Sequence, residues 1–293
     1  MARLAALASA SLLAVLVLPF AASAQEATFS RGQTVAPAYE GWERNADGSF
    51  NLVFGYMNRN WDETVDVPIG PENSIEPGGP DQGQPTHFLP RRNRFLFRIR
   101  VPKDFGNKEL VWTLTTKGKT ERAYATLKPD YFIDDQVVMM NFGRGVGDNE
   151  LFDNNKPPDV RVESPKSITA RVGEPVTLTA VATDDAYPKT RNLPPINPRV
   201  PGGIAQASAT GLRFAWFVYR GAGSVTFDPP QFKVQEDTRG GSPWSPGWTT
   251  PPVPKDNRWV VRATFAEPGT YVLRSLAHDG ALTDHEDVTV TVK

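Results

Sequence analysis

The sequence predicts an all-β protein built from two β-sandwich domains behind a cleaved signal peptide. Three observations lead to this prediction. Apolar and polar residues alternate with a period of two along most of the chain, as they do in half-buried strands. Gly and Pro, at 24 and 27 of 293 residues, are frequent enough to supply many turns. The length suits about two domains, and the chain contains no Cys that could form disulfides or bind zinc.

Residues 1–24 have the pattern of a secretory signal peptide. Arg3 supplies positive charge, a run rich in Leu and Val follows, and Ala22-Ser23-Ala24 has the small residues that precede a cleavage site. The apolar run is shorter than the ~20 residues that a membrane-spanning helix needs, so we expect removal of the segment rather than an uncleaved anchor. The protein is therefore expected to be exported, periplasmic or secreted, with no membrane span in the mature chain.

An N-terminal sandwich is expected over residues 25–145. In residues 93–101 the alternation predicts a buried apolar face and a basic outer face. The predicted buried residues are Phe95, Phe97, Ile99 and Val101, and the predicted outer residues are Arg94, Leu96, Arg98 and Arg100. Further strands are expected over residues 50–57, 110–115 and 120–127, the last two joined by a turn at Lys117-Gly118-Lys119. Residues 137–140 form either a short strand or the last packed segment of this domain.

A long loop over residues 68–90 interrupts the N-terminal domain. Its six Pro and four Gly exclude a central strand or a helix. Loops of this length in compact domains are usually functional or disordered. The amide, hydroxyl and carboxylate side chains favour an ordered loop with internal hydrogen bonds, and His87 is its candidate ligand-binding residue.

Residues 146–158 have the composition of a linker that few contacts cross. A second sandwich is expected over residues 159–293, with long insertions at residues 188–211 and 235–257. Its predicted strands are short and separated by turn signals. They cover residues 160–162, 176–182, 212–219, 225–227, 259–265, 271–278 and 287–293.

Two resemblances to known families support this division. One is carried by residues 173–185, 214–216, 267–273, 277–282 and 288–292. On these residues the C-terminal half resembles bacterial immunoglobulin-like domains of the PKD and cadherin-like kind. The resemblance implies that Trp216 is a core residue and implies no particular function. The other is carried by residues 41–43, 54–60, 68–73 and 83–88, on which the N-terminal half resembles an exported bacterial module of unknown function.

No constellation in the sequence has the chemistry of an enzyme, and we expect no catalytic residues. The chain has three His, His87, His278 and His285, and no Gly-x-Ser-x-Gly motif, so a nucleophile with its base and orienting acid is not indicated. The formal net charge of -1 argues against a nucleic-acid partner.

Calcium is the one cofactor that the sequence brings into question. Cadherin-like relatives use acidic loops, and Asp184, Asp185 and Asp279 are the candidate ligands, since calcium takes six to eight oxygen ligands. The alternative is a hydrated acidic turn, in which Asp279-Gly280 serves the turn geometry.

Two further sets of side chains are candidates for ligand contact. Trp244, Trp248 and Trp259 lie in or beside the second insertion and either stack on a ligand or fold back to cap the sandwich. Arg94 and Arg98 either bind an anion or form ion pairs across the strands with Glu109, Glu121 or Asp104.

The function expected from the sequence is that of an exported, non-catalytic binding or structural module of the bacterial envelope. Its loops would contact an envelope protein or a polysaccharide. One alternative is a carbohydrate-active enzyme, or its accessory domain, that uses acids near the 68–90 loop, such as Glu72 and Asp81. Another is a purely structural spacer.

Overall fold

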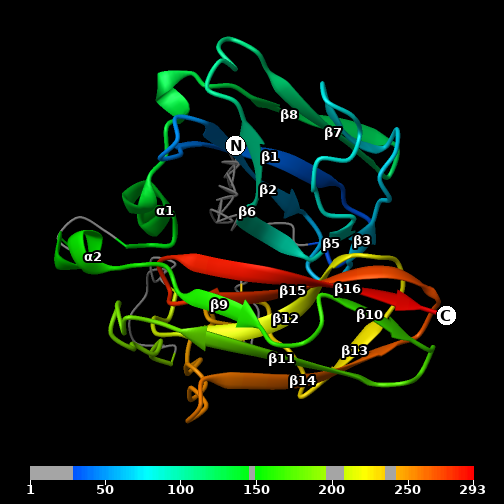
Figure 1. Ribbon diagram of the computed structural model, residues 1–293, viewed down its shortest axis with the longest axis vertical. Coiled ribbons are helices and arrows are strands. Elements are labelled where there is room, and N and C mark those ends of the chain that lie inside the picture. The colour runs from blue at the N-terminus through cyan, green and yellow to red at the C-terminus, as the bar shows by residue number, and fades with distance from the viewer. Residues whose placement is uncertain (1–28, 145–148, 196–207, 235–241) are drawn as a thin grey trace, which may run out of the picture.

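The computed structural model describes residues 29–144, 149–195, 208–234 and 242–293 and consists of two β-sandwiches, one above the other in Figure 1. The predicted signal peptide, and parts of both predicted insertions, lie outside these residues. Within the described residues no helix has the length and apolar character needed to cross a membrane.

Two antiparallel three-stranded sheets form the N-terminal sandwich. The first has the order β1-β2-β6 and the second the order β4-β7-β8, while β3 and β5 form a short ribbon beside them. The strands are β1 (Val35–Arg44), β2 (Phe50–Asn58), β3 (Val65–Asp66), β4 (Asn73–Glu76), β5 (His87–Phe88), β6 (Arg91–Val101), β7 (Leu110–Thr116) and β8 (Lys119–Ala125). The predicted hairpin is confirmed, since β7 and β8 pair through a turn in which Lys117 and Gly118 both have positive φ.

Aromatic side chains from facing strands fill the N-terminal core. Phe54 of β2 stacks on Phe97 of β6 with ring centroids 5.2 Å apart. The ring of Trp112 on β7 meets that of Phe97 edge-on at 5.2 Å, and its indole N–H donates to Oδ1 of Asn73 at 3.0 Å. The buried Trp112 is therefore satisfied both in packing and in hydrogen bonding.

A bulge in β6 corrects the predicted division of its faces. Phe54 pairs with Phe97 and Tyr56 with Asn93, so three residues of β6 lie opposite Gly55. Phe95, within this bulge, has a φ of 49° and packs into a different cluster from Phe97. The prediction that Phe95 shares a face with Phe97, Ile99 and Val101 is wrong, because strict alternation assumes an unbroken register.

Three short helical segments connect the sandwiches: η1 (Pro129–Tyr131), α1 (Asp135–Asn141) and α2 (Asn149–Asn154). Residues 137–140 are part of α1, so the strand alternative for them is wrong. Asp134 begins the helix, because its carboxylate accepts a hydrogen bond from the N–H of Val137 at 2.9 Å.

The C-terminal sandwich has two four-stranded sheets, with the orders β10-β16-β15-β12 and β13-β14-β11-β9. Its strands are β9 (Asp159–Val162), β10 (Ser167–Ala170), β11 (Val176–Thr183), β12 (Arg213–Arg220), β13 (Val225–Asp228), β14 (Arg258–Phe265), β15 (Gly269–His278) and β16 (Thr283–Val292). The core between the sheets holds Trp216, as the resemblance implied. The predicted immunoglobulin-like sandwich is confirmed.

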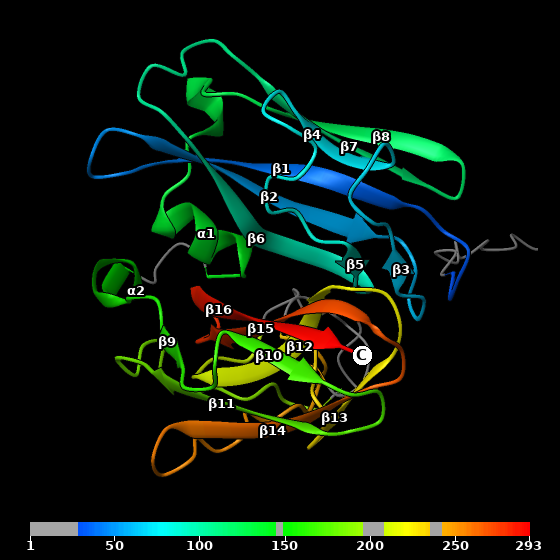
Figure 2. The same cartoon turned by 45° about the vertical axis from the view of Figure 1, so that its right-hand side comes forward.

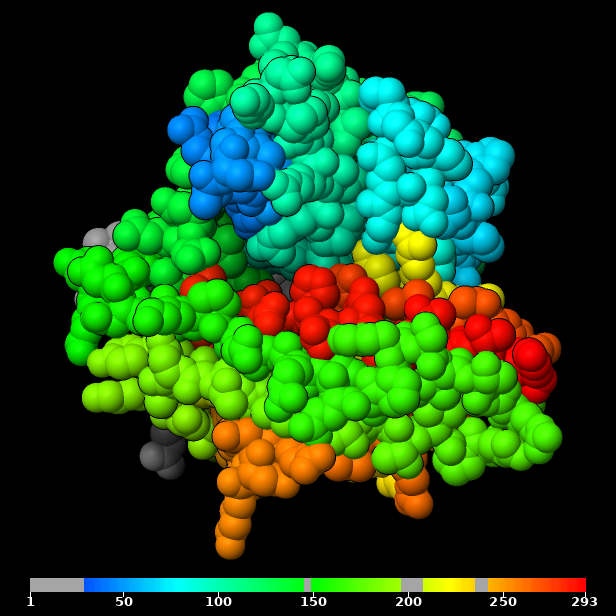
Figure 3. Space-filling model, in the orientation of Figure 1, coloured from blue at the N-terminus to red at the C-terminus, as the bar shows by residue number. Residues whose placement is uncertain are grey.

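The β10-β16-β15-β12 sheet faces the N-terminal sandwich, with β5 and β6 nearest to it (Figure 2). Figure 3 shows the two domains in contact along this face, where yellow atoms of the C-terminal domain lie against cyan atoms of the N-terminal domain. A cluster that we call the shared core lies between α1, α2 and both domains. Its buried members are Val53, Phe95, Ile133, Val138, Met139, Phe142, Leu151, Trp244, Ala281 and Leu282.

Candidate functional site between the two domains

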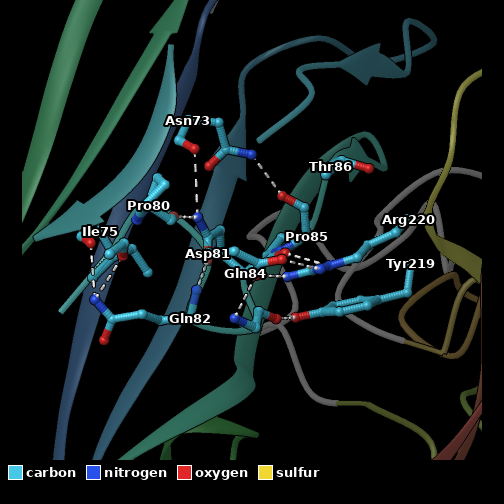
Figure 4. Close-up of polar contacts among 12 residues, drawn as sticks. Asn73, Ile75, Pro80, Asp81, Gln82, Gln84, Pro85, Thr86, Tyr219 and Arg220 are labelled. Atoms are coloured by element: carbon cyan, nitrogen blue, oxygen red, sulfur yellow. Dashed lines mark hydrogen bonds and ion pairs between the residues drawn. The ribbon is translucent and has the colours of Figure 1, made fainter. Parts of the chain in front are cut away.

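The 68–90 loop is ordered and hydrogen-bonded internally, as the sequence predicted. Amide side chains hold its turns together (Figure 4). The amide of Asn73 donates to the carbonyls of Val67 and Pro85, each at 2.9 Å. The amide of Gln84 donates to the carbonyl of Pro80 at 2.6 Å, and that of Gln82 to the carbonyl of Ile75 at 2.8 Å. Since Asn73 and Gln84 are completely buried, these bonds replace the water that the amides lose.

The loop docks on the end of β12. The hydroxyl of Tyr219 donates to the carbonyl of Gly83 at 2.5 Å, and the carbonyl of Tyr219 accepts from the N–H of Thr86 at 3.3 Å. Beside it, Nε of Arg220 donates to the carbonyl of Gln84 at 2.8 Å (Figure 4). The buried Tyr219 belongs to the core cluster of the N-terminal domain although it is a residue of the C-terminal one.

An ion pair completes this contact. The guanidinium of Arg220 binds both carboxylate oxygens of Asp81, at 2.7 and 3.1 Å. The hydrogen bond from Arg220 is the main reason that the pKa of Asp81 lies below its ordinary value. The next residue, Gly221, has a φ of 127° and donates to the hydroxyl of Thr86 at 3.0 Å. A Cβ there would lie 2.5 Å from the ring of Tyr271, so the close approach requires Gly.

Arg274 of β15 makes a second link between the domains. Its Nη1 donates to the carbonyl of Leu96 in the β6 bulge at 2.6 Å. Its Nε and Nη2 bind the carboxylate of Asp287, each at 2.8 Å. Arg274 is 5% exposed, and these partners offset the cost of placing its charge there.

A third link lies at the opposite end, around the buried His278. Its ring lies 4.6 Å from that of Phe142 and 6.2 Å from that of Trp244, centroid to centroid. Burial, and then the charges of Arg213 and Arg144, hold the pKa of His278 well below its ordinary value, so the imidazole is neutral. These three links contradict the expectation that few contacts join the domains.

A pocket of about 610 Å3 lies beside β12, between the two sandwiches. Apolar side chains line it from both domains, Leu89 and Pro90 on one side and Phe217 and Phe227 on the other. His87 also lines it, and its Nδ1 lies 2.6 Å from Oδ1 of Asp66. One candidate ligand-binding residue predicted from the sequence, His87, therefore lines the pocket. The sequence did not indicate that residues of the C-terminal domain line its other side.

The three tryptophans do not form one exposed surface. Trp244 is 7% exposed and belongs to the shared core, with the guanidinium of Arg213 5.4 Å from its ring centroid. Trp259 is half-buried and packs on Phe214 at 5.2 Å. Trp248, also half-buried, lies 5.7 Å from the ring of Phe232. Of the two alternatives for Trp244, contact with a ligand or packing against the protein, the structure has packing, because the ring lies among the shared-core residues beside α1.

Of the two candidate arginines of β6, Arg98 is ion-paired, with another acid than those expected, and Arg94 binds a backbone carbonyl. Arg98 binds both carboxylate oxygens of Glu43, each at 2.8 Å, and Arg94 donates to the carbonyl of Asn141 at the end of α1. Glu43 is on β1, a strand that the sequence analysis above does not predict. The neighbouring strand was therefore missed, and so were the partners.

The three candidate calcium ligands have different hydrogen-bond partners. Asp279 is buried and accepts from the N–H groups of Ala281 and Leu282 at 2.5 and 2.7 Å, as in the turn alternative. Asp185 accepts from the N–H of Lys156 at 3.1 Å. Burial, and then the carboxylate of Asp279, raise the pKa of Asp184 to about 7. Among the described residues no three acidic or His side chains are grouped as metal ligands.

Sequence reasoning missed the residues that join the domains, above all Tyr219, Arg220 and Arg274. Tyr219 alternates like any outer-face residue of a strand, and nothing in a single sequence separates a solvent-facing tyrosine from one buried against another domain.

Comparisons with known proteins give weak likenesses in structure. No protein-family model matches the chain, and no curated protein sequence matches it. A conjugative transposon lipoprotein from Bacteroides eggerthii is 12% identical, with a TM-score of 0.25 over 46% of this chain and 96% of that one. The fibronectin(III)-like modules of Clostridium thermocellum CbhA are 11% identical, with a TM-score of 0.23 over 89% and 94%.

The immunoglobulin domains 1–4 of Sidekick-1 are 10% identical, with a TM-score of 0.24 over 88% of this chain and 47% of that one. At TM-scores of this size the likenesses add nothing to the fold assignment, which rests on strand order and register.

Proposed function

We propose that the chain is an exported, non-catalytic module of the bacterial envelope. Its two sandwiches act as one rigid body that contacts a protein or a polysaccharide. The observation that carries this proposal is the use of the 68–90 loop. Instead of reaching outward, the loop binds Tyr219 and Arg220 of the other domain through its backbone carbonyls and Asp81. Such a joint removes the freedom expected between two linked domains. The signal-like pattern of residues 1–24 supports the exported location.

The acids named for the enzymatic alternative give that alternative little support. Asp81 is bound to Arg220, which keeps its carboxylate charged and occupied, whereas a general acid needs a raised pKa and a free proton. Glu72 is exposed, lies in the turn before β4 and does not line the 610 Å3 pocket, whereas glycoside hydrolysis needs two acids that flank the scissile bond.

Small-angle X-ray scattering tests the rigid joint. The intact protein is expected to have a radius of gyration near the ~19 Å of a compact chain of this length. The double variant Tyr219→Ala, Arg220→Ala should be more extended, and Arg262→Ala, at an exposed pair far from the joint, should not change. A radius of gyration of the intact protein well above the value for a compact chain would contradict the proposal.

One observation favours the carbohydrate-active alternative enough to test it. Asp66 and His87, 2.6 Å apart, line the 610 Å3 pocket together with Glu267, and paired acids beside aromatic rings are common in sugar sites. Incubation with a panel of envelope oligosaccharides, followed by chromatography, is expected to show no turnover. Turnover that Asp66→Asn abolishes would replace the non-catalytic function with the enzymatic one.

A further inference from the structure

The strand β12 is an edge of its sheet, and part of that edge is open. The N–H of Trp216 donates to Oε1 of Gln231 at 2.9 Å, so the backbone groups of Trp216 point away from β15. Backbone groups alternate in direction along an antiparallel strand. The N–H and C=O of Val218, two residues on, therefore also point to the free edge.

Outward backbone groups before and after Val218 have hydrogen-bond partners, while those of Val218 itself have none among the described residues. Gln231 covers the Trp216 side, and the Thr86 N–H covers the carbonyl of Tyr219 after the bulge in β12. Among the described residues, none donates to or accepts from the outward backbone groups of Val218. An open backbone pair at a sheet edge is the template on which another strand adds.

The 610 Å3 pocket lies along this open edge. Val218 lines it, with His87 and Pro90 of the N-terminal domain on one side and Val225 and Phe227 of β13 on the other. Successive side chains of an added strand point in opposite directions. One would therefore contact the wall formed by the N-terminal domain, and the next would contact the wall formed by the C-terminal domain. The joint between the domains is what holds these walls at a fixed separation.

The pocket is acidic at the end where β15 begins. Asp66 and Glu267 both line it, and after burial their charges raise the pKa of Tyr271. His87 is paired with Asp66. Lys233, the cation of the pocket, donates to the carbonyls of Pro90 and Arg92 at 2.6 and 3.0 Å. The exposed Glu267 remains to attract a positive side chain.

We propose that the free edge of β12 binds an extended segment of a partner protein by strand addition at Val218. The segment carries a Lys or Arg that pairs with Glu267 and Asp66. This inference rests on the proposed contact function and names its partner chemistry. Main-chain hydrogen bonds would supply affinity and the two walls specificity, as in other proteins that bind an added strand. The unpaired backbone groups favour a peptide over a sugar, which has no backbone ladder to offer.

Fluorescence anisotropy with a labelled heptapeptide tests the proposal in the full chain. The probe is acetyl-Thr-Val-Lys-Val-Thr-Val-Thr-amide, compared with the same peptide N-methylated at alternate residues so that it cannot form the ladder. We expect the methylated peptide to bind at least tenfold more weakly. Ser224→Trp, which fills the pocket from an exposed position, and Glu267→Lys should each weaken binding of the unmethylated peptide at least tenfold. Glu174→Lys, an equal charge reversal away from the pocket, should change it less than twofold.

Several results would overturn the inference. They are an absence of saturable binding, equal binding of the two peptides, or indifference to Ser224→Trp. Displacement of the peptide by envelope oligosaccharides would identify a sugar as the occupant. A dimer in sedimentation experiments that Ser224→Trp abolishes would identify a second copy of the chain. None of these results bears on the non-catalytic function itself, which only turnover would contradict. Circular dichroism of each variant separates loss of binding from loss of fold.

Discussion

The guanidinium carbon of Arg274 lies 3.6 Å from the ring centroid of Tyr219, and both side chains are buried between the domains. Burial raises the pKa of Tyr219 to about 12, so the ring faces the cation as a neutral phenol. A desolvated cation–π contact of this kind contributes ~2 kcal/mol. It links the 68–90 loop, which Tyr219 holds, to the β6 bulge, which Arg274 holds.

Replacing Arg274 by Met should lower the free energy of unfolding by about 3 kcal/mol, because it leaves the carbonyl of Leu96 unpaired and Asp287 without its cation. Urea unfolding followed by tryptophan fluorescence measures this. Arg262→Met is the matched control: its pair with Asp228 is exposed and should cost less than ~0.5 kcal/mol. An equal decrease in the free energy of unfolding in the two variants would mean that the buried contacts of Arg274 stabilise the fold no more than an exposed ion pair does.

The ion pair between Asp81 and Arg220 should matter to the loop more than to global stability. Asp81→Asn keeps one hydrogen bond to Arg220 and is expected to cost about 1 kcal/mol. Hydrogen exchange should speed up at the amides of Gly83 and Thr86, which lie in the docked part of the loop, and stay unchanged in the β11–β14 pair. Uniform acceleration across both domains would contradict a local effect.

Trp244→Ala and Trp248→Ala should separate packing from surface exposure. Loss of the buried Trp244 leaves a cavity in the shared core and should cost ~3–5 kcal/mol. Loss of the half-buried Trp248 should cost less than about 2 kcal/mol. Thermal unfolding of the two variants measures the difference, and similar melting temperatures would show that Trp244 is not a packing residue.

The pH dependence of stability should contain a contribution from Asp184 and Asp279. Burial raises the pKa of Asp184 from 3.8 to about 7 and that of Asp279 from 3.8 to about 6. The folded state therefore holds these protons more tightly than the unfolded chain. The stabilisation is fully present below about pH 4 and is lost as the pH rises through 6 to 7.

Asp184→Asn keeps an acceptor for the N–H of Ala186 and removes the repulsion from Asp279. The variant should be more stable than the parent protein at pH 8, and the difference should shrink towards pH 4. Urea midpoints measured at both pH values test this, with the exposed Asp153→Asn as control. A difference between Asp184→Asn and its parent that is the same at pH 4 and pH 8 would contradict the assigned repulsion.

Much of the fold could be predicted from the sequence because alternation is a local signal. The strand from Phe50, the hairpin at Lys117 and the core position of Trp216 all depend on neighbours within a few residues. The β6 bulge could not be predicted, since a shift in register changes which face Phe95 occupies without changing the apolar pattern. The N-cap Asp134 was a readable signal for α1, but a four-residue apolar run does not distinguish a helix from a strand.

The candidate site was predicted only in part, for a physical reason. The polar composition of residues 68–90 correctly indicated an ordered loop. The contact of Tyr219 and Arg220 with this loop depends on how the two folded domains dock. These residues and the loop are more than a hundred positions apart in the sequence, so no local pattern indicates that they meet. The same reason explains why the sequence left open whether Trp244 contacts a ligand or packs in the protein, where the structure has it buried.

Because of the bulge at Phe95, side chains of β6 pack in two different cores. Phe97 and Ile99 pack in the core of their own domain, while Phe95 packs in the shared core. A recombinant fragment ending in the 146–158 segment would consequently leave Phe95, Val53 and α1 uncovered, and an apolar patch left open in this way promotes aggregation. Neither domain should therefore be stable in solution when expressed alone, and the smallest well-behaved fragment should contain both domains.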